Sequence, residues 1–284
     1  MVFSTLISVE EVFPHLSDPN WAMIDCRFSL EHPRRGRQDY LAAHLPGAVY
    51  ASLDEDLSAP VVPGQTGRHP LPSMEKLTQL FSGWGIDSEV QVVAYDDYPN
   101  MGLSTAPRLW WMLRWLGHER VAVLDGGWFR WVSQGLPLQA GIVTRPRRQF
   151  VPSVQPQLLA DSDWVEKIRL DQNARLFDSR SADRYRGENE TLDPVAGHIP
   201  GAINAPYSEN VGAEGLFLPP ESLRERFAPL IGETPANQVV FYCGSGVTAA
   251  NTVLAFAHAG LGDARLYAGS WSEWITDPRR PVER

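Results

Sequence analysis

Short apolar runs alternate with segments of helical periodicity in the second half of the chain. Short runs that predict strands lie at 175–178, 238–242 and 264–267, and the run at 238–242, rich in β-branched and aromatic residues, is typical of a buried strand. Segments typical of helices lie at 161–170, 221–230 and 248–259. Strands that alternate with helices predict an α/β domain, in which helices flank a mostly parallel sheet.

The chain contains an internal repeat. Four landmarks of the first half return in the same order 143 to 154 residues later: Asp25-Cys26-Arg27 as Asp178-Ser179-Arg180, His44-Leu45-Pro46-Gly47-Ala48 as His198-Ile199-Pro200-Gly201-Ala202, Tyr95-Asp96 as Tyr242-Cys243, and Gly127-Trp128 as Ser270-Trp271. Such a repeat indicates a duplicated domain of about 130 residues. We predict a first domain at 1–138, a surface linker rich in Pro, Arg and Gln at 139–156, and a second domain at 157–284.

Composition and charge exclude some classes of function. The net charge of −9 over 284 residues argues against non-specific binding to nucleic acid or to an anionic membrane surface. No apolar stretch approaches the roughly 20 residues of a membrane helix. The first basic residue is Arg27, so we expect neither a signal nor a transit peptide, and we expect a cytoplasmic location. The two cysteines, Cys26 and Cys243, argue against a disulfide framework.

Cys243 follows a predicted buried strand and opens a glycine-rich loop. Gly244 and Gly246 allow a tight turn in which several backbone N–H groups point inward, and the following helix adds the free N–H groups of its first turn. These donors stabilise a thiolate, so we expect the pKa of Cys243 to be lowered. The same cradle would stabilise a persulfide anion. The alternative is a buried structural cysteine, but such a residue would not need Gly-Ser-Gly beside it.

Other site motifs fit these residues poorly. Gly244-Ser-Gly-Val-Thr-Ala249 matches the dinucleotide pattern G-x-G-x-x-A, but too little chain follows it to complete a nucleotide-binding fold. A Walker A loop would need a lysine, and the phosphate loop of a cysteine phosphatase would need an arginine near Thr248. The two cysteines lack the spacing of zinc ligands. A nucleophilic thiol is the interpretation that the loop favours.

The segment Cys243-Gly-Ser-Gly-Val-Thr-Ala249 resembles the active-site loop of the 3-mercaptopyruvate sulfurtransferases, which belong to the rhodanese family. The repeat, with Gly197-His-Ile-Pro-Gly-Ala-Ile203, resembles two rhodanese domains in tandem, and Ser104–Trp111 and Leu124–Trp128 resemble the inactive first domain of that family. The resemblance implies that only the second domain carries the reactive cysteine. Asp96 stands at the matching position of the first domain and cannot form a persulfide.

The resemblance also implies how the donor is bound. Arg184 matches the family arginine that holds the anionic end of the donor, with Arg186 as the second candidate. The loop backbone at Gly244, Gly246, Val247 and Thr248 would complete the substrate-binding site. Mercaptopyruvate enzymes have a second substrate arginine, but 188–196 contains none. The neutral residues after Cys243 suit a keto acid, whereas thiosulfate enzymes often have cationic residues there, and we give the loop more weight.

A proton relay is implied as well. Ser245 resembles the family serine that works with a histidine and an aspartate, and His69 and Asp56 match those partners. Both lie in the first copy, so we expect a site between the two domains. Arg68 would help to attract anions. Cys26, on the first strand of the inactive copy, is expected to be buried and inert.

We therefore expect a sulfurtransferase that works by double displacement. Cys243 takes sulfur from 3-mercaptopyruvate or thiosulfate as a persulfide, and a thiol acceptor such as thioredoxin or a small thiol, or cyanide, removes it. No metal or organic cofactor is required. The alternatives are a thiosulfate sulfurtransferase, a non-catalytic persulfide carrier or redox sensor in which a partner protein loads Cys243, and, more distantly, a metabolic dehydrogenase.

Overall fold

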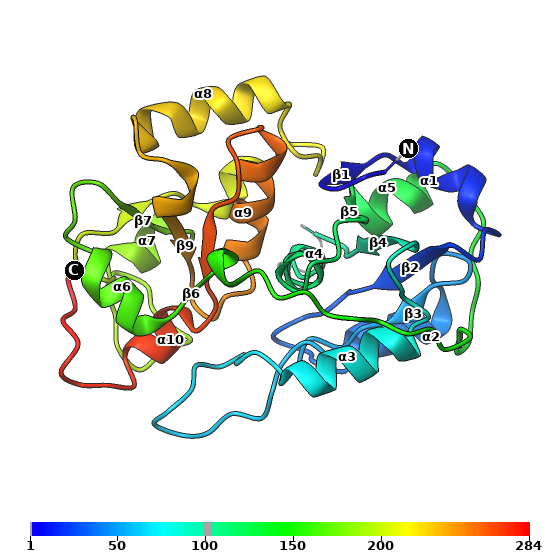
Figure 1. The fold of residues 1–284 in the computed structure, drawn as a ribbon, viewed down its shortest axis with the longest axis horizontal. Coiled ribbons are helices and arrows are strands. Elements are labelled where there is room, and N and C mark those ends of the chain that lie inside the picture. The colour runs from blue at the N-terminus through cyan, green and yellow to red at the C-terminus, as the bar shows by residue number, and fades with distance from the viewer. Residues whose placement is uncertain (1, 99–103) are drawn as a thin grey trace. The chain divides into compact units, whose positions relative to one another are not determined.

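The computed structural model describes residues 2–98 and 104–284, which form two compact units (Figure 1). The first unit contains the residues up to Ala59, then Pro72–Gln155 and Ala213–Leu216. The second contains Pro60–Leu71, Pro156–Gly212 and Phe217–Arg284. Residues 60–71 therefore pack with the second unit, although the sequence repeat places them in the first copy.

The first unit is built on a parallel sheet of five strands. Their order is β1-β5-β4-β2-β3, with β1 at Leu6–Ile7, β2 at Trp21–Asp25, β3 at Val49–Tyr50, β4 at Gln91–Tyr95 and β5 at Val121–Leu124. The helices that flank it are α1 (Val9–Val12), α2 (Arg35–Ala42), α3 (Met74–Gly83), α4 (Ala106–Trp115) and α5 (Gly127–Ser133).

The second unit repeats this topology. Its parallel sheet has the order β6-β10-β9-β7-β8, with β6 at Leu159–Ala160, β7 at Arg175–Asp178, β8 at Ile203–Asn204, β9 at Val239–Tyr242 and β10 at Arg265–Tyr267. Its helices are α6 (Ser162–Ile168), α7 (Ala182–Tyr185), α8 (Pro220–Ile231), α9 (Ala249–His258) and α10 (Ser270–Trp274). The α/β fold class predicted for both domains is confirmed.

The predicted elements of the second unit form where the periodicity is strong. Strand β7 has the predicted bounds. Strand β9 begins one residue later than predicted, and α9 is one residue shorter than predicted at each end. Asp161 caps α6, because its side chain accepts a hydrogen bond from the N–H of Trp164 at 2.7 Å. The sequence did not predict β6, β8 or α7, because elements of two to four residues are too short to show a period.

The repeated Asp-x-Arg landmark is an internal ion pair. Nε and Nη2 of Arg180 donate to Asp178, and Nη2 also donates to the carbonyl oxygen of Gly197 at 2.7 Å. In the first unit, Arg27 pairs with Asp25 and donates to the carbonyl oxygen of Ala43 in the same way. The pair ties the end of β2 or β7 to the loop before the next strand, so this motif supports the fold in both units.

Residues 139–155 form no helix and only one isolated bridge, between Gln139 and His44. They are attached to the first unit: Arg145 donates to the carbonyl oxygen of Trp84 at 3.0 Å, and Phe150 is buried.

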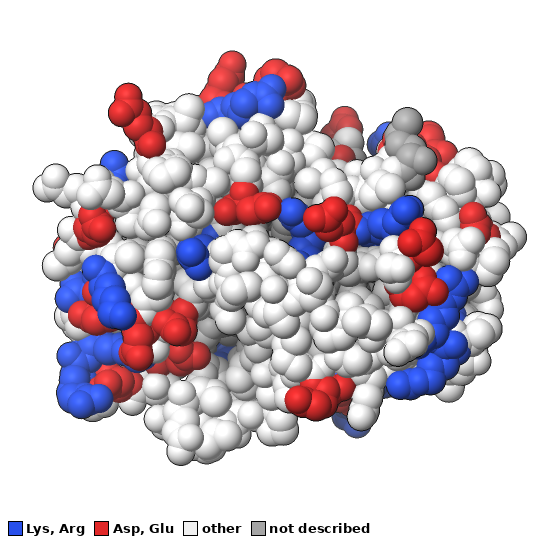
Figure 2. Space-filling view, in the orientation of Figure 1, with Lys and Arg blue, Asp and Glu red and all other residues white. Residues whose placement is uncertain are grey.

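Among the described residues, no helix is long and apolar enough to span a membrane. On the face that Figure 2 shows, acidic and basic side chains are interspersed among the described residues and do not gather into a broad basic patch.

Candidate active site

Cys243 lies at the carboxyl end of β9, where the buried strand gives way to the loop that leads into α9. Its N–H donates to Oγ of Ser270 at 3.1 Å, and its carbonyl oxygen accepts from the N–H of Trp271 at 3.0 Å. The carbonyl oxygen of Gly244 accepts from the N–H of Ser272 at 2.9 Å. The start of the loop is thus fixed by the first turn of α10.

Two backbone positions around this loop are constrained. Ser270 is the one non-glycine residue of the described chain with a positive φ, at 58°, and its hydroxyl donates to the carbonyl oxygen of Tyr267 at 2.9 Å. Gly246 has a φ of 74°, and a Cβ there would lie 2.1 Å from the carbonyl oxygen of Ala268. Only glycine fits at position 246, as the sequence analysis expected for a tight turn.

The loop lowers the pKa of the Cys243 thiol. Burial of this side chain, which is 1% exposed, raises the pKa, but hydrogen bonds from the Thr248 hydroxyl and from the N–H groups of Ser245, Ala249 and Gly246 lower it by more. These donors stabilise the thiolate. The predicted lowering of the pKa of Cys243 is confirmed.

The remaining predicted loop residue, Val247, is buried, and its carbonyl oxygen accepts from the N–H of Ala250 at 3.2 Å. The carbonyl oxygen of Thr248 accepts from the N–H of Asn251 at 3.1 Å. Both residues therefore begin the first turn of α9 while Thr248 also contacts the thiol.

Cys26 has the opposite environment. It is 1% exposed in the first unit, and burial, together with the negative charges of Asp96, Asp25 and Asp56, raises its pKa well above the ordinary thiol value. A neutral buried thiol is a poor nucleophile. The burial expected for Cys26 is confirmed.

Ser245 and His69 are brought together by the fold. Nδ1 of His69 and Oγ of Ser245 lie 2.8 Å apart, and both residues are buried in the second unit. The segment that carries His69 is attached to α10, because the N–H of Arg68 donates to Oγ of Ser272 at 3.0 Å. His69 comes from the first copy of the sequence, yet its contact with the loop lies within the second compact unit.

Asp56 belongs to the first unit. Its Oδ2 accepts a hydrogen bond from the N–H of Ser52 at 2.8 Å. Burial raises the pKa of its carboxyl group, although the hydrogen bond from Ser52 lowers it in part.

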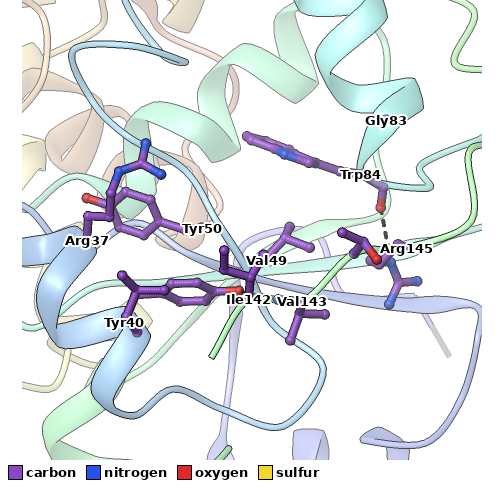
Figure 3. A pocket seen from close by; sticks show the side chains of 11 residues that line it. Arg37, Tyr40, Val49, Tyr50, Gly83, Trp84, Ile142, Val143 and Arg145 are labelled. Carbon is purple, nitrogen blue, oxygen red and sulfur yellow. Dashed lines mark hydrogen bonds between the residues drawn. The ribbon is translucent and has the colours of Figure 1, made fainter. Parts of the chain in front are cut away.

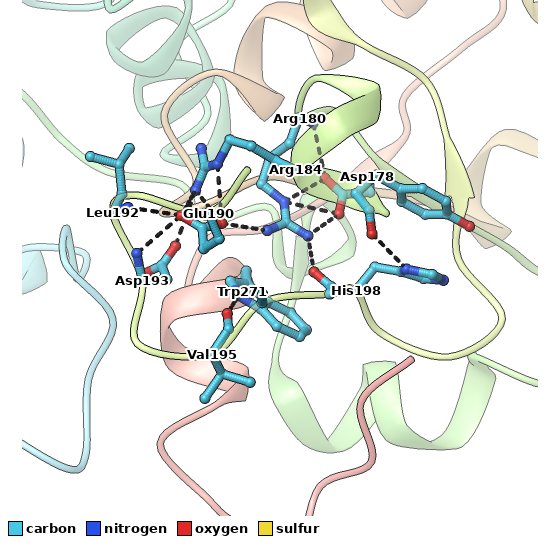
Figure 4. A network of polar contacts seen from close by, with 12 residues as sticks. Asp178, Arg180, Arg184, Glu190, Leu192, Asp193, Val195, His198 and Trp271 are labelled. Atoms are coloured by element: carbon cyan, nitrogen blue, oxygen red, sulfur yellow. Dashed lines mark hydrogen bonds and ion pairs between the residues drawn. The ribbon is translucent and has the colours of Figure 1, made fainter. Parts of the chain in front are cut away.

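Arg184, on α7, is held by two carboxylates (Figure 4). Its Nε donates to Oε2 of Glu190 at 3.1 Å, and its Nη2 donates to Oε1 of Glu190 at 2.9 Å and to Oδ2 of Asp193 at 3.2 Å. Burial raises the pKa of Glu190, but hydrogen bonds from the N–H groups of Leu192 and Asp193 and from Arg184 lower it below its ordinary value. Arg186 instead pairs with Glu188 on the surface, where its side chain is 53% exposed.

Both Arg68 and Arg184 reach the residue that follows Cys243. A Cβ placed on Gly244 would lie 2.7 Å from Nη2 of Arg68 and 3.5 Å from Nη2 of Arg184. The loop has no cationic side chain of its own, but two guanidinium groups lie beside it. Asp193 pairs with both arginines, and Glu190 pairs with Arg184. Neither carboxylate was predicted from the sequence, where the available signal was three acidic residues closely following Arg184.

At the matching position of the first unit, an acid takes the place of the thiol. Oδ2 of Asp96 accepts hydrogen bonds from the N–H groups of Thr105 and Ala106 at 2.7 and 2.8 Å. Burial raises its pKa to about 6. The backbone donors of this unit thus bind a side-chain carboxyl group that belongs to the chain itself.

The first unit also contains a cavity of about 370 Å³ (Figure 3). Tyr40, Tyr50, Trp84, Val143 and Arg145 are among the residues that line it. Neither cysteine lines this cavity. The thiol of lowered pKa, the arginines and the histidine described above lie at the Cys243 loop, so that loop is the candidate site rather than this cavity.

The chain is similar to known proteins over most of its length. The model of the rhodanese-like domain matches residues 8–134 and 161–277. The chain is 45% identical over 283 residues to a probable 3-mercaptopyruvate sulfurtransferase of Pseudomonas aeruginosa, with 99% of each protein covered. It is 40% identical to the putative thiosulfate sulfurtransferase SseB of Mycobacterium tuberculosis, with 93% of this chain and 90% of that protein covered. The solved structure of SseA from Escherichia coli, a 3-mercaptopyruvate sulfotransferase by its description, has a TM-score of 0.81 and 32% identity, with 95% of this chain and all of that chain covered.

Proposed function

Since this chain belongs to the rhodanese family and is a sulfurtransferase, we propose that it takes sulfur from 3-mercaptopyruvate as a persulfide on Cys243 and passes it to a thiol or cyanide. The observation that carries the proposal is the environment of Cys243, a buried thiol whose pKa is lowered by four hydrogen-bond donors of its own loop and helix. The similarity to the P. aeruginosa and E. coli proteins supports 3-mercaptopyruvate as the donor.

In the first half of the cycle, the Cys243 thiolate attacks the sulfur atom of 3-mercaptopyruvate. A sulfur–sulfur bond forms as the carbon–sulfur bond breaks, and the electron pair of that bond leaves with carbon as the enolate of pyruvate. The enolate takes up a proton and becomes pyruvate. The outer sulfur remains on Cys243, where the N–H groups of the loop stabilise the persulfide anion as they stabilise the thiolate.

In the second half, an acceptor thiolate attacks the outer sulfur. The new bond forms between the two sulfur atoms of the acceptor persulfide, and the Cys243 thiolate leaves and is ready for another cycle. Cyanide as the acceptor gives thiocyanate. The second step needs no other reactant, so the cycle closes with the groups that the donor, the acceptor and this chain supply.

Ser245, His69 and Asp56 form the proton relay of this proposal. The 2.8 Å contact between Ser245 and His69 supports the first link, in which the serine hydroxyl delivers a proton to the leaving enolate and is resupplied through the imidazole. Asp56 is assigned to the relay on the resemblance alone. Arg184 holds the carboxylate of the donor, and its position beside Gly244 supports that role.

Thiosulfate is the second candidate donor. The similarity to the putative thiosulfate sulfurtransferase of M. tuberculosis favours it, as does the absence of arginine from 188–196. Thiosulfate transfers its outer sulfur in the same way, but the leaving group is sulfite, which needs no proton. The two donors therefore differ in their dependence on the relay.

We expect steady-state kinetics to show a higher kcat/KM for 3-mercaptopyruvate than for thiosulfate. We also expect Ser245→Ala to lower kcat/KM about tenfold for 3-mercaptopyruvate, the effect of one lost hydrogen bond at a site where water can still supply the proton. The same variant should leave thiosulfate turnover within about twofold of the wild type. If thiosulfate is the better donor and both donors slow equally, thiosulfate is the substrate and Ser245 is not a proton donor.

The pH dependence of sulfur loading tests the role of Thr248. The loading rate should rise with pH as Cys243 loses its proton and level off above a midpoint that lies below the ordinary thiol pKa. Thr248→Val removes the largest of the stabilising hydrogen bonds, so the pKa of Cys243 rises and the midpoint moves to higher pH.

Thr252→Val is the matched control, because it makes the same change within α9, four residues further on, at a buried side chain that contacts Asn210. Its midpoint should equal that of the wild type. A midpoint that Thr248→Val leaves in place would show that the backbone donors alone set the pKa.

A further inference from the structure

The carboxylate of Asp193 bridges the two arginines beside Gly244. Oδ1 of Asp193 accepts from Nη1 of Arg68, and Oδ2 accepts from Nη2 of Arg184 at 3.2 Å. The carboxylate is only 2% exposed, whereas the side chains of Arg68 and Arg184 are 28% and 19% exposed. A buried anion of this chain therefore already occupies the position between two cations that border the Cys243 loop.

The loop that carries Asp193 is fixed in place. The N–H of Asp193 donates to Oε1 of Glu190 at 3.0 Å, and Glu190 in turn accepts from Arg184 and from Nη1 of Arg180 at 3.2 Å. Both carboxylates are 2% exposed. Displacing Asp193 from the arginines would break this network, so a donor has to bind with Asp193 still present.

The bridge cancels the positive charge of the arginines. Arg68 and Arg184, with the Arg180 that shares Glu190, carry three positive charges, and Asp193, Glu190 and Asp178, the partner of Arg180, carry three negative charges, so the six side chains have no net charge. A donor next to this cluster is attracted by the exposed guanidinium edges and repelled by the Asp193 carboxylate. The repulsion is proportional to the charge of the donor, and it is twice as large for the thiosulfate dianion as for the single carboxylate of 3-mercaptopyruvate.

We propose that Asp193 is a specificity-determining residue, whose carboxylate between Arg68 and Arg184 selects singly charged donors over doubly charged ones. The inference rests on the proposed function, because it takes Arg184 as the residue that holds the anionic end of the donor. It also gives the 188–196 loop a definite role. The loop lacks a second arginine, but its Asp193 offsets the positive charge of Arg68 and Arg184, which other segments supply.

The test is Asp193→Asn in the full chain, which removes the charge and keeps the size. The ratio of kcat/KM for thiosulfate to kcat/KM for 3-mercaptopyruvate should rise about tenfold, since the dianion gains the larger relief. Glu188→Gln is the matched control, because it removes one charge from the same loop at an exposed pair with Arg186, and its ratio should stay within about twofold of the wild type. An unchanged ratio in Asp193→Asn overturns the proposal.

Asp193→Glu separates charge from packing, because it keeps the charge and alters the fit. The ratio of kcat/KM for the two donors should stay near that of the wild type, even if the added methylene lowers kcat/KM for both. If Asp193→Glu changes the ratio as much as Asp193→Asn does, the network geometry and not the charge is responsible, and the proposal falls. Thermal unfolding of each variant shows whether it keeps its fold. The ratio of the two kcat/KM values is then compared at a temperature below the lowest unfolding transition.

Binding without chemistry distinguishes this proposal from the proposed function. In a Cys243→Ser background, titration calorimetry should show that Asp193→Asn tightens thiosulfate binding about tenfold more than pyruvate binding. If the wild type transfers sulfur from neither donor but the calorimetric difference is present, the proposed function fails and the role of Asp193 stands. If sulfur transfer proceeds and Asp193→Asn shifts neither the kinetic nor the binding ratio, only the role of Asp193 fails.

Discussion

Cys243→Ala should abolish sulfur loading and lower the rate of sulfur transfer on the order of a thousandfold or more, because the proposed covalent intermediate forms on this thiol. Intact-mass measurement of the wild type after treatment with 3-mercaptopyruvate should show one added sulfur atom, and peptide mapping should place it on Cys243. The physical reason is the contrast between the two thiols: hydrogen bonds lower the pKa of Cys243, whereas burial and three carboxyl groups raise that of Cys26.

Cys26→Ser is the control for this experiment. It removes the other thiol of the chain, which is equally buried, and it should load sulfur at the wild-type rate. Sulfur found on Cys26, or sulfur that remains in Cys243→Ala, would contradict the assignment. The result would then point to a carrier that exchanges sulfur through a site other than the glycine-rich loop.

Arg184→Ala should lower kcat/KM for 3-mercaptopyruvate about ten- to a hundredfold. The lost interaction is a charge-assisted contact between the guanidinium group and the donor carboxylate, which contributes about 1.5–3 kcal/mol. The effect should appear mainly in KM, since the donor loses binding in the ground state as well as in the transition state. Initial rates over a range of donor concentrations, with pyruvate as the measured product, would check this.

The matched control is Arg186→Ala. Arg186 stands two positions away, carries the same charge and pairs with Glu188 at the surface. The kcat/KM of this variant for 3-mercaptopyruvate should therefore stay within about twofold of the wild type. Arg184→Ala also leaves Glu190 with fewer partners, and we expect a loss of about 1–3 kcal/mol in unfolding free energy, measured by urea denaturation. If Arg186→Ala has the larger effect on kcat/KM, the donor arginine is Arg186.

Features that depend on residues close together in the chain could be predicted before the structure was known. The strands and helices around Cys243 follow from local periodicity, and the need for glycine at 246 follows from the tight turn between a strand and a helix. The lowered pKa of Cys243 could be predicted for the same reason, because its donors come from the next six residues. The duplication could be read because both copies kept the same landmarks.

The way in which distant segments meet at the Cys243 loop could be seen only in the folded protein. Residues 60–71 pack with the second unit and bring His69 to Ser245 across 176 positions of sequence, a contact that no local period encodes. The same packing brings Arg68 to Asp193, 125 positions away. Hydrogen bonds and ion pairs of this kind depend on where whole loops pack, so residue types alone show the charges but not their partners. That is why the sequence could point to Cys243 as the candidate nucleophile, whereas the structure was needed to show that the carboxylate of Asp193 pairs with the two arginines beside the loop.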